Sequence, residues 1–347
     1  MKKIYLLVLG ISCLINISDS NACSRVVYTG PNGTVITGRT MDWKTEMFSN
    51  IWLFPRGMER DGVGGENSLK WVSKYGSVVT SAFEIASTDG LNEKGLVANL
   101  LWLPGSEYPK RDISKPGLSI AAWVQYMLDN FATVNEAVSA IKEDSFQVVS
   151  DLMPDGSRLA TLHLSISDAT GDNAIFEYIG GKLIVYHSKD YKVMTNSPTY
   201  DKQLALNDYW KSIGGLTFLP GTNRATDRFV RASFYVDALP QISDEKVAVA
   251  SVFSVIRNVS VPYGISTPES PEISTTQWRT VSDSKNLNYF FESSLTPNAF
   301  WVRLQDVNLA KGAPVLKLTV ANGETYNGNV AKNLKPTQPF KFYGIKN

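Results

Sequence analysis

One cysteine near the start of the chain has the surroundings of a nucleophile. Cys23 follows Ala22, and Arg39 and Asp42 come shortly after it. A thiolate attacks a carbonyl carbon far better than a thiol does, and an ordinary cysteine is mostly thiol near neutral pH, so the chemistry needs a base. If the chain is cut before Cys23, the α-amine of that residue has an unperturbed pKa of about 7.7 to 8. Such an amine suits a general base, so these residues indicate a nucleophile that carries its own base.

The first 22 residues have the pattern of a signal peptide. Lys2 and Lys3 form a positive start, residues 4–15 are apolar, and Ser20 and Ala22 are the small residues that a signal peptidase reads. The apolar run is too short to span a bilayer, and no other run is long enough, so no membrane span is expected. We therefore expect residues 1–22 to be removed, and residues 23–347 to form one domain that is periplasmic or secreted.

Other interpretations of the cysteine remain open. Cys13 leaves with the leader, so one thiol remains and it has no intramolecular disulfide partner. A bacterial lipoprotein also begins at a cysteine, but it prefers leucine three positions earlier, where this chain has Ser20. A plain buried cysteine is a further alternative. A Cys–His pair would need His163 or His187, and both lie in runs typical of strands.

Composition narrows the range of partners. The chain has 43% apolar and 11% aromatic residues, which is ordinary for a globular protein. Its formal charge is +1, and loss of Lys2, Lys3 and Asp19 leaves 32 basic and 32 acidic residues, so nothing indicates nucleic acid or an anionic membrane. The two remaining histidines are far apart, without the spacing of zinc ligands. We expect neither a metal nor a cofactor.

A hairpin is predicted directly after the cysteine. Residues 24–29 alternate like a strand, "GPNG" at 30–33 is a strong turn, and 34–37 form the returning strand. A tight bend is expected at Gly38, before another strand begins. The hairpin would bring Arg39 back beside residue 23, where a guanidinium favours the thiolate. Asp42 could hold the protonated amine, and a salt bridge at the hairpin end is the structural alternative.

The rest of the chain mixes strands and paired helices. Helix spacing appears at 118–131, 134–144, 225–239 and 244–259, and strand patterns at 50–54, 69–73, 76–83, 162–167, 173–179, 182–187 and 192–196. Thr133 and Glu136 form a capping-box start. Helices in pairs between blocks of strands indicate an α+β fold. The Gly-rich, charged segment 55–68 is expected to be a mobile loop that walls a substrate pocket.

Four stretches together resemble a known family. They are Cys23 with the following "GRTMDW", then "DGLNEKGLVANLLWLPG" (89–105), "VMTNSPTYDKQ" (193–203) and "ATDRFVRASF" (225–234). In this order they resemble the choloylglycine hydrolase family, the bile salt hydrolases and penicillin V acylases among the N-terminal-nucleophile hydrolases. The resemblance implies a four-layer αββα sandwich of two mainly antiparallel sheets.

The resemblance also implies roles for five residues. Cys23 would be the nucleophile and, through its amine, the base, with Arg39 and Asp42 supporting the thiolate and the amine. Asn196 would donate its amide to the oxyanion, and Arg228 would complete the polar network. Without the resemblance, Asn196 is also favoured before a Ser-Pro turn for local reasons, and Arg228 could be a solvated helix residue.

Trp102 departs from the family pattern. Many members have asparagine at this position, so its side-chain contribution to the oxyanion is lost, although the backbone N–H could still serve. An aromatic residue here resembles the branch found in Gram-negative bacteria. Met41, Trp43 and Trp102 are candidates for an apolar wall around the acyl group, with core packing as the alternative. The segment between Asn196 and Arg228 looks shorter than in members with an interlocking hairpin, so a homo-oligomer, tetramer or dimer, is a weaker implication.

These observations lead to one functional hypothesis and one alternative. The hypothesis is an exported amidase that cleaves a linear C–N amide of an apolar acyl group through a thioester. Bile salts, penicillin V and acyl homoserine lactones are the substrates that the resemblance implies, and aryl or alkyl groups are favoured over a steroid because Trp102 would narrow the mouth. The alternative is a non-catalytic periplasmic lipoprotein or ligand-binding member of the fold.

Overall fold

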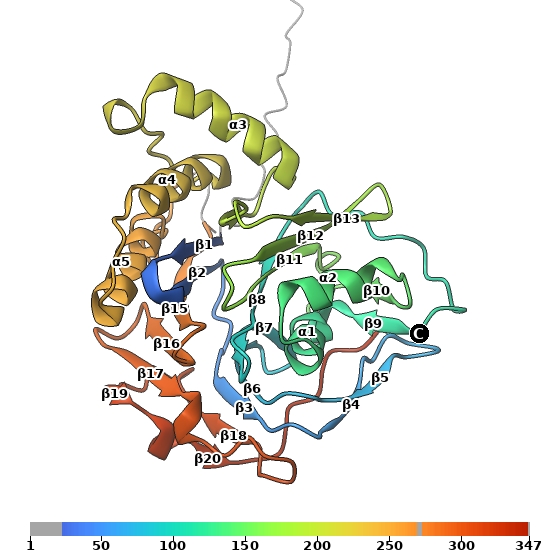
Figure 1. Cartoon of the computed structure of the whole chain (residues 1–347). Coiled ribbons are helices and arrows are strands. Elements are labelled where there is room, and N and C mark those ends of the chain that lie inside the picture. Colours follow the sequence, from blue (N-terminus) through green and yellow to red (C-terminus); the bar gives the residue numbers. More distant parts are fainter. Residues whose placement is uncertain (1–22, 269–272, 346–347) are drawn as a thin grey trace, which may run out of the picture.

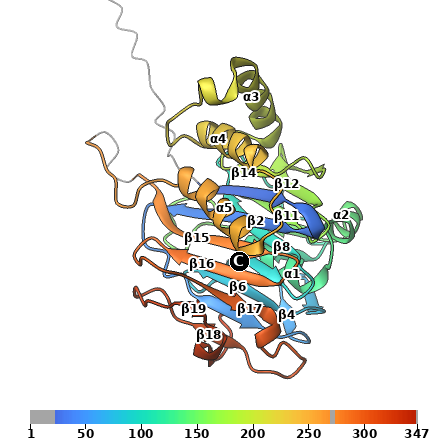
Figure 2. The same ribbon diagram turned by 60° about the vertical axis from the view of Figure 1, so that its left-hand side comes forward.

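The computed structural model describes residues 23–268 and 273–345, and the predicted leader lies outside these ranges. Two large sheets face each other, and we call them the first and the second sheet (Figures 1 and 2). In spatial order, the first sheet contains β14 (Val193–Thr195), β1 (Ser24–Thr29), β2 (Val35–Trp43), β15 (Thr275–Asp283), β16 (Asn288–Ser293), β17 (Ala299–Arg303) and β19 (Gly328–Asn329).

The second sheet is longer. In spatial order it contains β13 (Lys182–His187), β12 (Asn173–Ile179), β11 (Leu162–Ser167), β8 (Val97–Trp102), β7 (Ala86–Asn92), β6 (Ser77–Ala82), β3 (Ile51–Phe54), β18 (Leu316–Leu318) and β20 (Lys335–Pro336). Two small pairs stand beside it, β4 (Glu59–Asp61) with β5 (Lys70–Val72) and β9 (Gly117–Ser119) with β10 (Gln147–Val149). Neighbouring strands within both large sheets run antiparallel, except for β17 and β19.

Helices cover the outer faces of both sheets. Helices α4 (Ala225–Ala238) and α5 (Glu245–Asn258) pack on β1 and β2, whereas α1 (Trp123–Asn130) packs on β7 and β8, with α2 (Val134–Lys142) beside it (Figure 1). Helix α3 (Tyr200–Ile213) packs against α4 and projects away from the sheets. The order helix, sheet, sheet, helix confirms the expected four-layer αββα sandwich.

Strand β2 shows why the middle of the fold is so deeply buried. All nine of its residues are buried, because α5 covers one face of the first sheet and the second sheet covers the other. One apolar cluster fills the space between the sheets and beneath α4 and α5, and a second lies under α1 and α2. Strands covered on both faces need not alternate between apolar and polar residues in the way a half-exposed strand does.

The predicted bend at Gly38 is wrong. Strand β2 runs straight through this residue and pairs with β1 and β15 along its length. A glycine is needed here for another reason. A Cβ at this position would lie 2.7 Å from Val252 Cγ1 and 2.8 Å from Ile256 Cγ2, both on α5. Gly38 therefore lets α5 approach the sheet closely, which is a packing requirement rather than a turn signal.

Most predicted elements appear, with some shifted boundaries. Residues 118–131 are not one helix, since they include the end of β9, a 3₁₀ turn (Ile120–Ala122) and α1. The capping residue is confirmed, because Thr133 Oγ1 accepts from the backbone N–H of Glu136 at 3.2 Å. Helix α3 and strands β7, β8 and β15 to β20 were not among the predicted elements. Within the described ranges, no helix has the length and apolar character that a bilayer crossing requires.

Gly38→Ala should destabilise the protein by about 1 to 3 kcal/mol, because the added methyl group overpacks the contact between β2 and α5. Urea unfolding monitored by fluorescence measures this change in the free energy of unfolding. Gly105→Ala is the matched control, since a Cβ there meets nothing within 4 Å. Equal stability of both variants would show that α5 is not packed as tightly as described.

Candidate active site

Strand pairing places the sequence-predicted residues around the first residue of the described chain. Ser24 lies opposite Thr40 on β2 and opposite Thr195 on β14. Extending both registers by one residue puts Cys23 between Met41 and Asn196. Two residues that are far apart in the sequence therefore flank the cysteine because β1 pairs on both of its edges.

The thiol of Cys23 is buried in a mixed environment. Its Sγ lies 3.9 Å from Met41 Sδ, and the backbone N–H of Asp42 donates to the sulfur at 3.4 Å. Burial raises the pKa of the Cys23 thiol, and the nearby Arg39 charge and the Asp42 N–H act in the opposite direction. A base close to the sulfur is therefore needed to generate a thiolate.

Arg39 lies between the two sheets. It is fully buried, and it donates to the carbonyl oxygens of Thr88 at 3.1 Å and Leu100 at 2.8 Å. Both lie next to Asp89 and Asn99, the end pair of the β7–β8 ladder, since Thr88 precedes Asp89 and Leu100 follows Asn99. The guanidinium also lies 3.7 Å from the Asp89 carboxylate and 3.5 Å from Met41 Sδ. The residue opposite Arg39 on β1 is Arg25, so Arg39 does not lie directly beside Cys23. Its charge acts on the thiol electrostatically, from beyond Met41.

The Asp42 carboxylate belongs to a network centred on Arg228. It accepts a hydrogen bond from Thr276 Oγ1 at 2.5 Å and a longer one from Thr40 Oγ1 at 3.3 Å. The Arg228 guanidinium lies 3.6 Å from it. Burial raises the pKa of Asp42 to about 6, against the opposing effects of Arg228 and the two hydroxyl groups.

Arg228 and Asn196 complete the network. Arg228 on α4 is fully buried, so it is not a solvated helix residue, and it donates to Ser24 Oγ at 2.5 Å. It also donates to Asn196 Oδ1 at 3.5 Å. Asn196 Nδ2 in turn donates to the carbonyl oxygen of Trp102 at 2.7 Å. An amide nitrogen carries two hydrogens and this bond uses one, so the arrangement orients the other as a donor.

An apolar cavity adjoins the thiol. Cys23, Arg39 and the three predicted wall residues Met41, Trp43 and Trp102 all line it. The rings of Trp43 and Trp102 meet edge to face at 5.3 Å, and the Arg158 guanidinium lies 4.4 Å from the Trp102 ring centroid.

The remaining wall comes from other segments than expected. The cavity-lining residues include members of 82–88, 119–121 and 151–154, together with Tyr343 near the C-terminus. The prediction that segment 55–68 walls the pocket is wrong, because none of its residues lines this cavity. The segment contains β4, which pairs with β5, and the Gly62 carbonyl accepts from the backbone N–H of the wall residue Ser119. The mobility of the segment stays a prediction.

The two histidines have carboxylate partners. His163 Nδ1 lies 2.9 Å from Glu177 Oε1, and His187 Nε2 lies 2.7 Å from Asp172 Oδ2. Neither contact involves the thiol, whose described contacts are with Met41 and Asp42. In residues 23–268 and 273–345, no group of three or more His, Cys, Asp or Glu side chains is arranged to hold a metal ion.

Sequence reasoning missed the residues that hold the charged groups in place. Thr276 on β15 is bonded to Asp42, and Tyr289 on β16 donates to Asp89 at 2.6 Å. Asn99 also donates to Asp89, at 2.6 Å. Threonine and tyrosine are ordinary strand residues, so nothing in the local pattern distinguishes them from strand residues without such a role.

The raised pKa of Asp42 has a consequence for stability. The unfolded value is about 3.9, so between this pH and about pH 6 the folded protein holds a proton that the unfolded chain has lost. The contribution of Asp42 is therefore fully present below the unfolded pKa and is lost as pH rises toward the folded pKa. As pH rises through this window, the free energy of unfolding should therefore fall less steeply in Asp42→Asn than in the wild type. The two slopes should differ by up to about 1.4 kcal/mol per pH unit.

Chemical unfolding at several pH values measures this slope. Asp208→Asn, on the exposed side of α3, is the control and should keep the wild-type slope. An unchanged slope in Asp42→Asn would mean that Asp42 is ionised throughout this range in the folded protein.

Comparison with known proteins agrees with this geometry. A family model for linear amide C–N hydrolases, the choloylglycine hydrolase family, matches residues 23–320. The chain is similar to a penicillin V acylase of Pectobacterium atrosepticum, with 51% identity over 350 residues that cover 94% of this chain and 93% of that protein. It is also similar, at 25% identity over 297 residues, to a bile salt hydrolase/transferase of Bifidobacterium longum, covering 78% and 92% of the two chains.

A solved structure, the penicillin V acylase from Agrobacterium tumefaciens, superposes with a TM-score of 0.87. Its sequence identity is 57%, and the match covers 93% of this chain and 100% of that one. The chain therefore belongs to the choloylglycine hydrolase family, as an amide hydrolase of the penicillin V acylase and bile salt hydrolase type that acts on carbon–nitrogen bonds of linear amides.

Proposed function

We propose that the protein, once residues 1–22 are removed, hydrolyses amides of apolar acyl groups through a thioester on Cys23. The observation that carries this proposal is the position of the thiol, which lies at an apolar cavity and next to the Asp42–Arg228–Asn196 network. The cavity can hold the acyl group, while the network supplies polar groups for the reacting amide.

The proposed reaction has two halves. The α-amine of Cys23 takes the thiol proton, the sulfur attacks the amide carbon, and the C–N bond breaks as the amine passes that proton to the leaving nitrogen. A water molecule then attacks the thioester, which releases the acid and restores the thiol. Asn196 Nδ2 is the proposed oxyanion donor, and loss of one such donor typically costs about 2.7 to 4 kcal/mol of transition-state stabilisation.

We propose that the acyl group of the substrate is aryl or alkyl, with a size like that of the phenoxyacetyl group of penicillin V. The similarity to two penicillin V acylases supports this choice. The edge-to-face pair of Trp43 and Trp102 also supports it, because flat aromatic walls suit a phenoxy ring or a straight chain better than a rigid steroid. Long-chain acyl homoserine lactones fit the same apolar requirement.

Export and removal of the leader are part of the proposal. They are supported by the signal-peptide pattern of residues 1–22 and by a family match that begins at Cys23. N-terminal mass spectrometry of the protein recovered from the periplasm tests them. An unmodified cysteine at the N-terminus supports the enzyme, whereas a diacylated cysteine supports the lipoprotein alternative.

Processed wild-type protein should hydrolyse penicillin V faster than glycine- or taurine-conjugated bile salts. Cys23→Ser should keep the fold and lose activity by about 10² or more, because serine is a weaker nucleophile beside so modest a base. Release of the free amine measures turnover, and circular dichroism checks folding. Full activity in Cys23→Ser, or in a precursor that keeps its leader, would contradict the mechanism.

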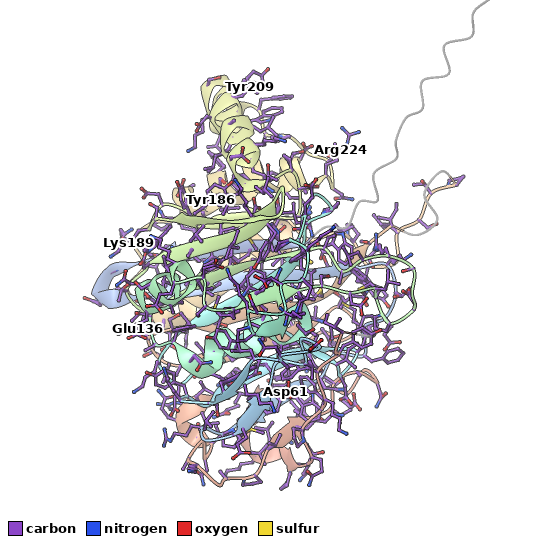
Figure 3. The ribbon with its side chains drawn as sticks, turned by 90° about the vertical axis from the view of Figure 1, so that its right-hand side faces the viewer. Asp61, Glu136, Tyr186, Lys189, Tyr209 and Arg224 are labelled. Carbon is purple, nitrogen blue, oxygen red and sulfur yellow. The ribbon has the colours of Figure 1, made fainter. Side chains whose placement is uncertain are left out.

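A homo-oligomer remains a proposal, with support from an exposed apolar face. Helix α3 and the turn after it expose large hydrophobic side chains, and Figure 3 shows Tyr209 far out on this projection. The residues of this face are Leu206, Tyr209, Ile213, Leu216 and Phe218. Because Leu216 is 86% exposed, we expect Leu216→Asp to weaken self-association.

Analytical ultracentrifugation over a range of concentrations measures the oligomeric state. Val72→Asp, which also changes an exposed apolar residue but lies on β5, is the control. A wild-type monomer at every concentration would contradict the oligomer.

A further inference from the structure

The C-terminal tail lies beyond the segment that matches the family model. The match ends at residue 320, and the described chain continues to residue 345. After β20 the tail runs back along the second sheet, where the backbone N–H of Thr337 donates to the Val315 carbonyl at 2.9 Å (Figure 1). This part of the protein can therefore add a feature that the family pattern does not describe.

Aromatic side chains anchor the tail before it reaches the cavity. The Phe340 ring meets the Trp52 ring at 5.1 Å and the Phe54 ring at 5.6 Å, both edge to face. The Phe342 ring follows at 5.3 Å from Phe340, and both phenylalanines pack against the apolar cluster under α1 and α2. Such ring pairs hold the backbone of this otherwise irregular segment.

The next residue, Tyr343, joins two segments of the cavity wall. Its backbone N–H donates to the carbonyl of Ile85 at 2.9 Å, and its carbonyl accepts from Ser119 Oγ at 2.7 Å. Ile85, Ser119 and Tyr343 all line the cavity that contains Cys23. Two residues later, the N–H of Ile345 donates to the Val63 carbonyl at 3.1 Å, so the backbone is held on both sides of Tyr343.

We propose that Tyr343 is a specificity-determining residue that limits the size of the acyl group. This inference rests on the proposed function, since it concerns the same cavity and the same acyl half of the substrate. Because the backbone at and after Tyr343 is hydrogen-bonded to the wall, the residue stays at this place, and an acyl group that extends to it must fit beside the tyrosine. Differences of one methylene in an apolar pocket change kcat/KM by about 10- to 200-fold, so one aromatic ring suffices to set a preference.

Two variants of opposite size test the proposal. The substrates are amides of one amine, 6-aminopenicillanic acid, with acyl groups that increase from phenylacetyl and phenoxyacetyl to octanoyl and dodecanoyl. Tyr343→Ala should raise kcat/KM for the largest acyl group relative to phenoxyacetyl by about tenfold or more. Tyr343→Trp should shift the same ratio in the opposite direction.

Two controls separate wall size from other effects. Lys341→Ala, an exposed change in the same tail, should leave the ratio unchanged. Tyr343→Phe should also keep it, because the ring remains. Thermal unfolding of each variant reports folding, and if Tyr343→Ala does not fold, Tyr343→Trp and Tyr343→Leu provide the test.

The outcomes distinguish this inference from the proposed function. A wild-type protein that hydrolyses none of the amides would contradict the proposed function. A wild-type protein that hydrolyses them, with folded Tyr343 variants whose preference matches wild type, would overturn only the assignment of Tyr343.

Discussion

A buried positive charge between two sheets is the constraint on which this structure depends. Arg39 belongs to the first sheet, but its guanidinium donates to two carbonyl groups at the edge of the β7–β8 ladder in the second. A charge in a dry interior is costly unless it is hydrogen-bonded and paired, and here Asp89 is the nearest counter-charge. Asp89 is in turn bonded to Tyr289 of the first sheet and Asn99 of the second. Moving one sheet relative to the other would leave these groups without partners.

The hairpin of β1 and β2 separates two chemical environments. On its inner side, Arg39 and Met41 lie at the apolar cavity. On its outer side, Asp42 and Ser24 contact Arg228 of α4. Cys23 stands at the start of β1, in contact with Met41 and with the backbone of Asp42. A thiol at this position can meet an apolar acyl group without moving the charged network into the cavity.

The raised pKa values of Cys23 and Asp42 have the same origin. Both groups lose contact with water on burial, which raises their pKa values, and the positive charges of the nearby arginines offset only part of this rise. Perturbed groups of this kind are typical of catalytic sites, because acids, bases and nucleophiles there need pKa values that are matched to their task. For this family, the arrangement agrees with amide hydrolysis, and a free α-amine at Cys23 would add the base that the buried thiol requires.

Local patterns in the sequence determined much of the fold and the choice of candidate site residues. Strands β11, β12 and β13 begin and end where alternation and the Gly180–Gly181 turn predict, and Thr133 caps its helix. The cysteine after a leader-like segment, with four matching stretches behind it, was enough to indicate the family.

Contacts between distant segments were decided only by the tertiary structure. Gly38 resembles a turn residue until α5 is seen to lie against it. Nothing near Thr276 or Asp89 in the sequence reveals that they hold Asp42 and Arg39, and Tyr343 reaches the cavity from the far end of the chain. Periodicity and turn chemistry act over a few neighbouring residues. The packing of charges and cavity walls depends on which surfaces meet after the two sheets close.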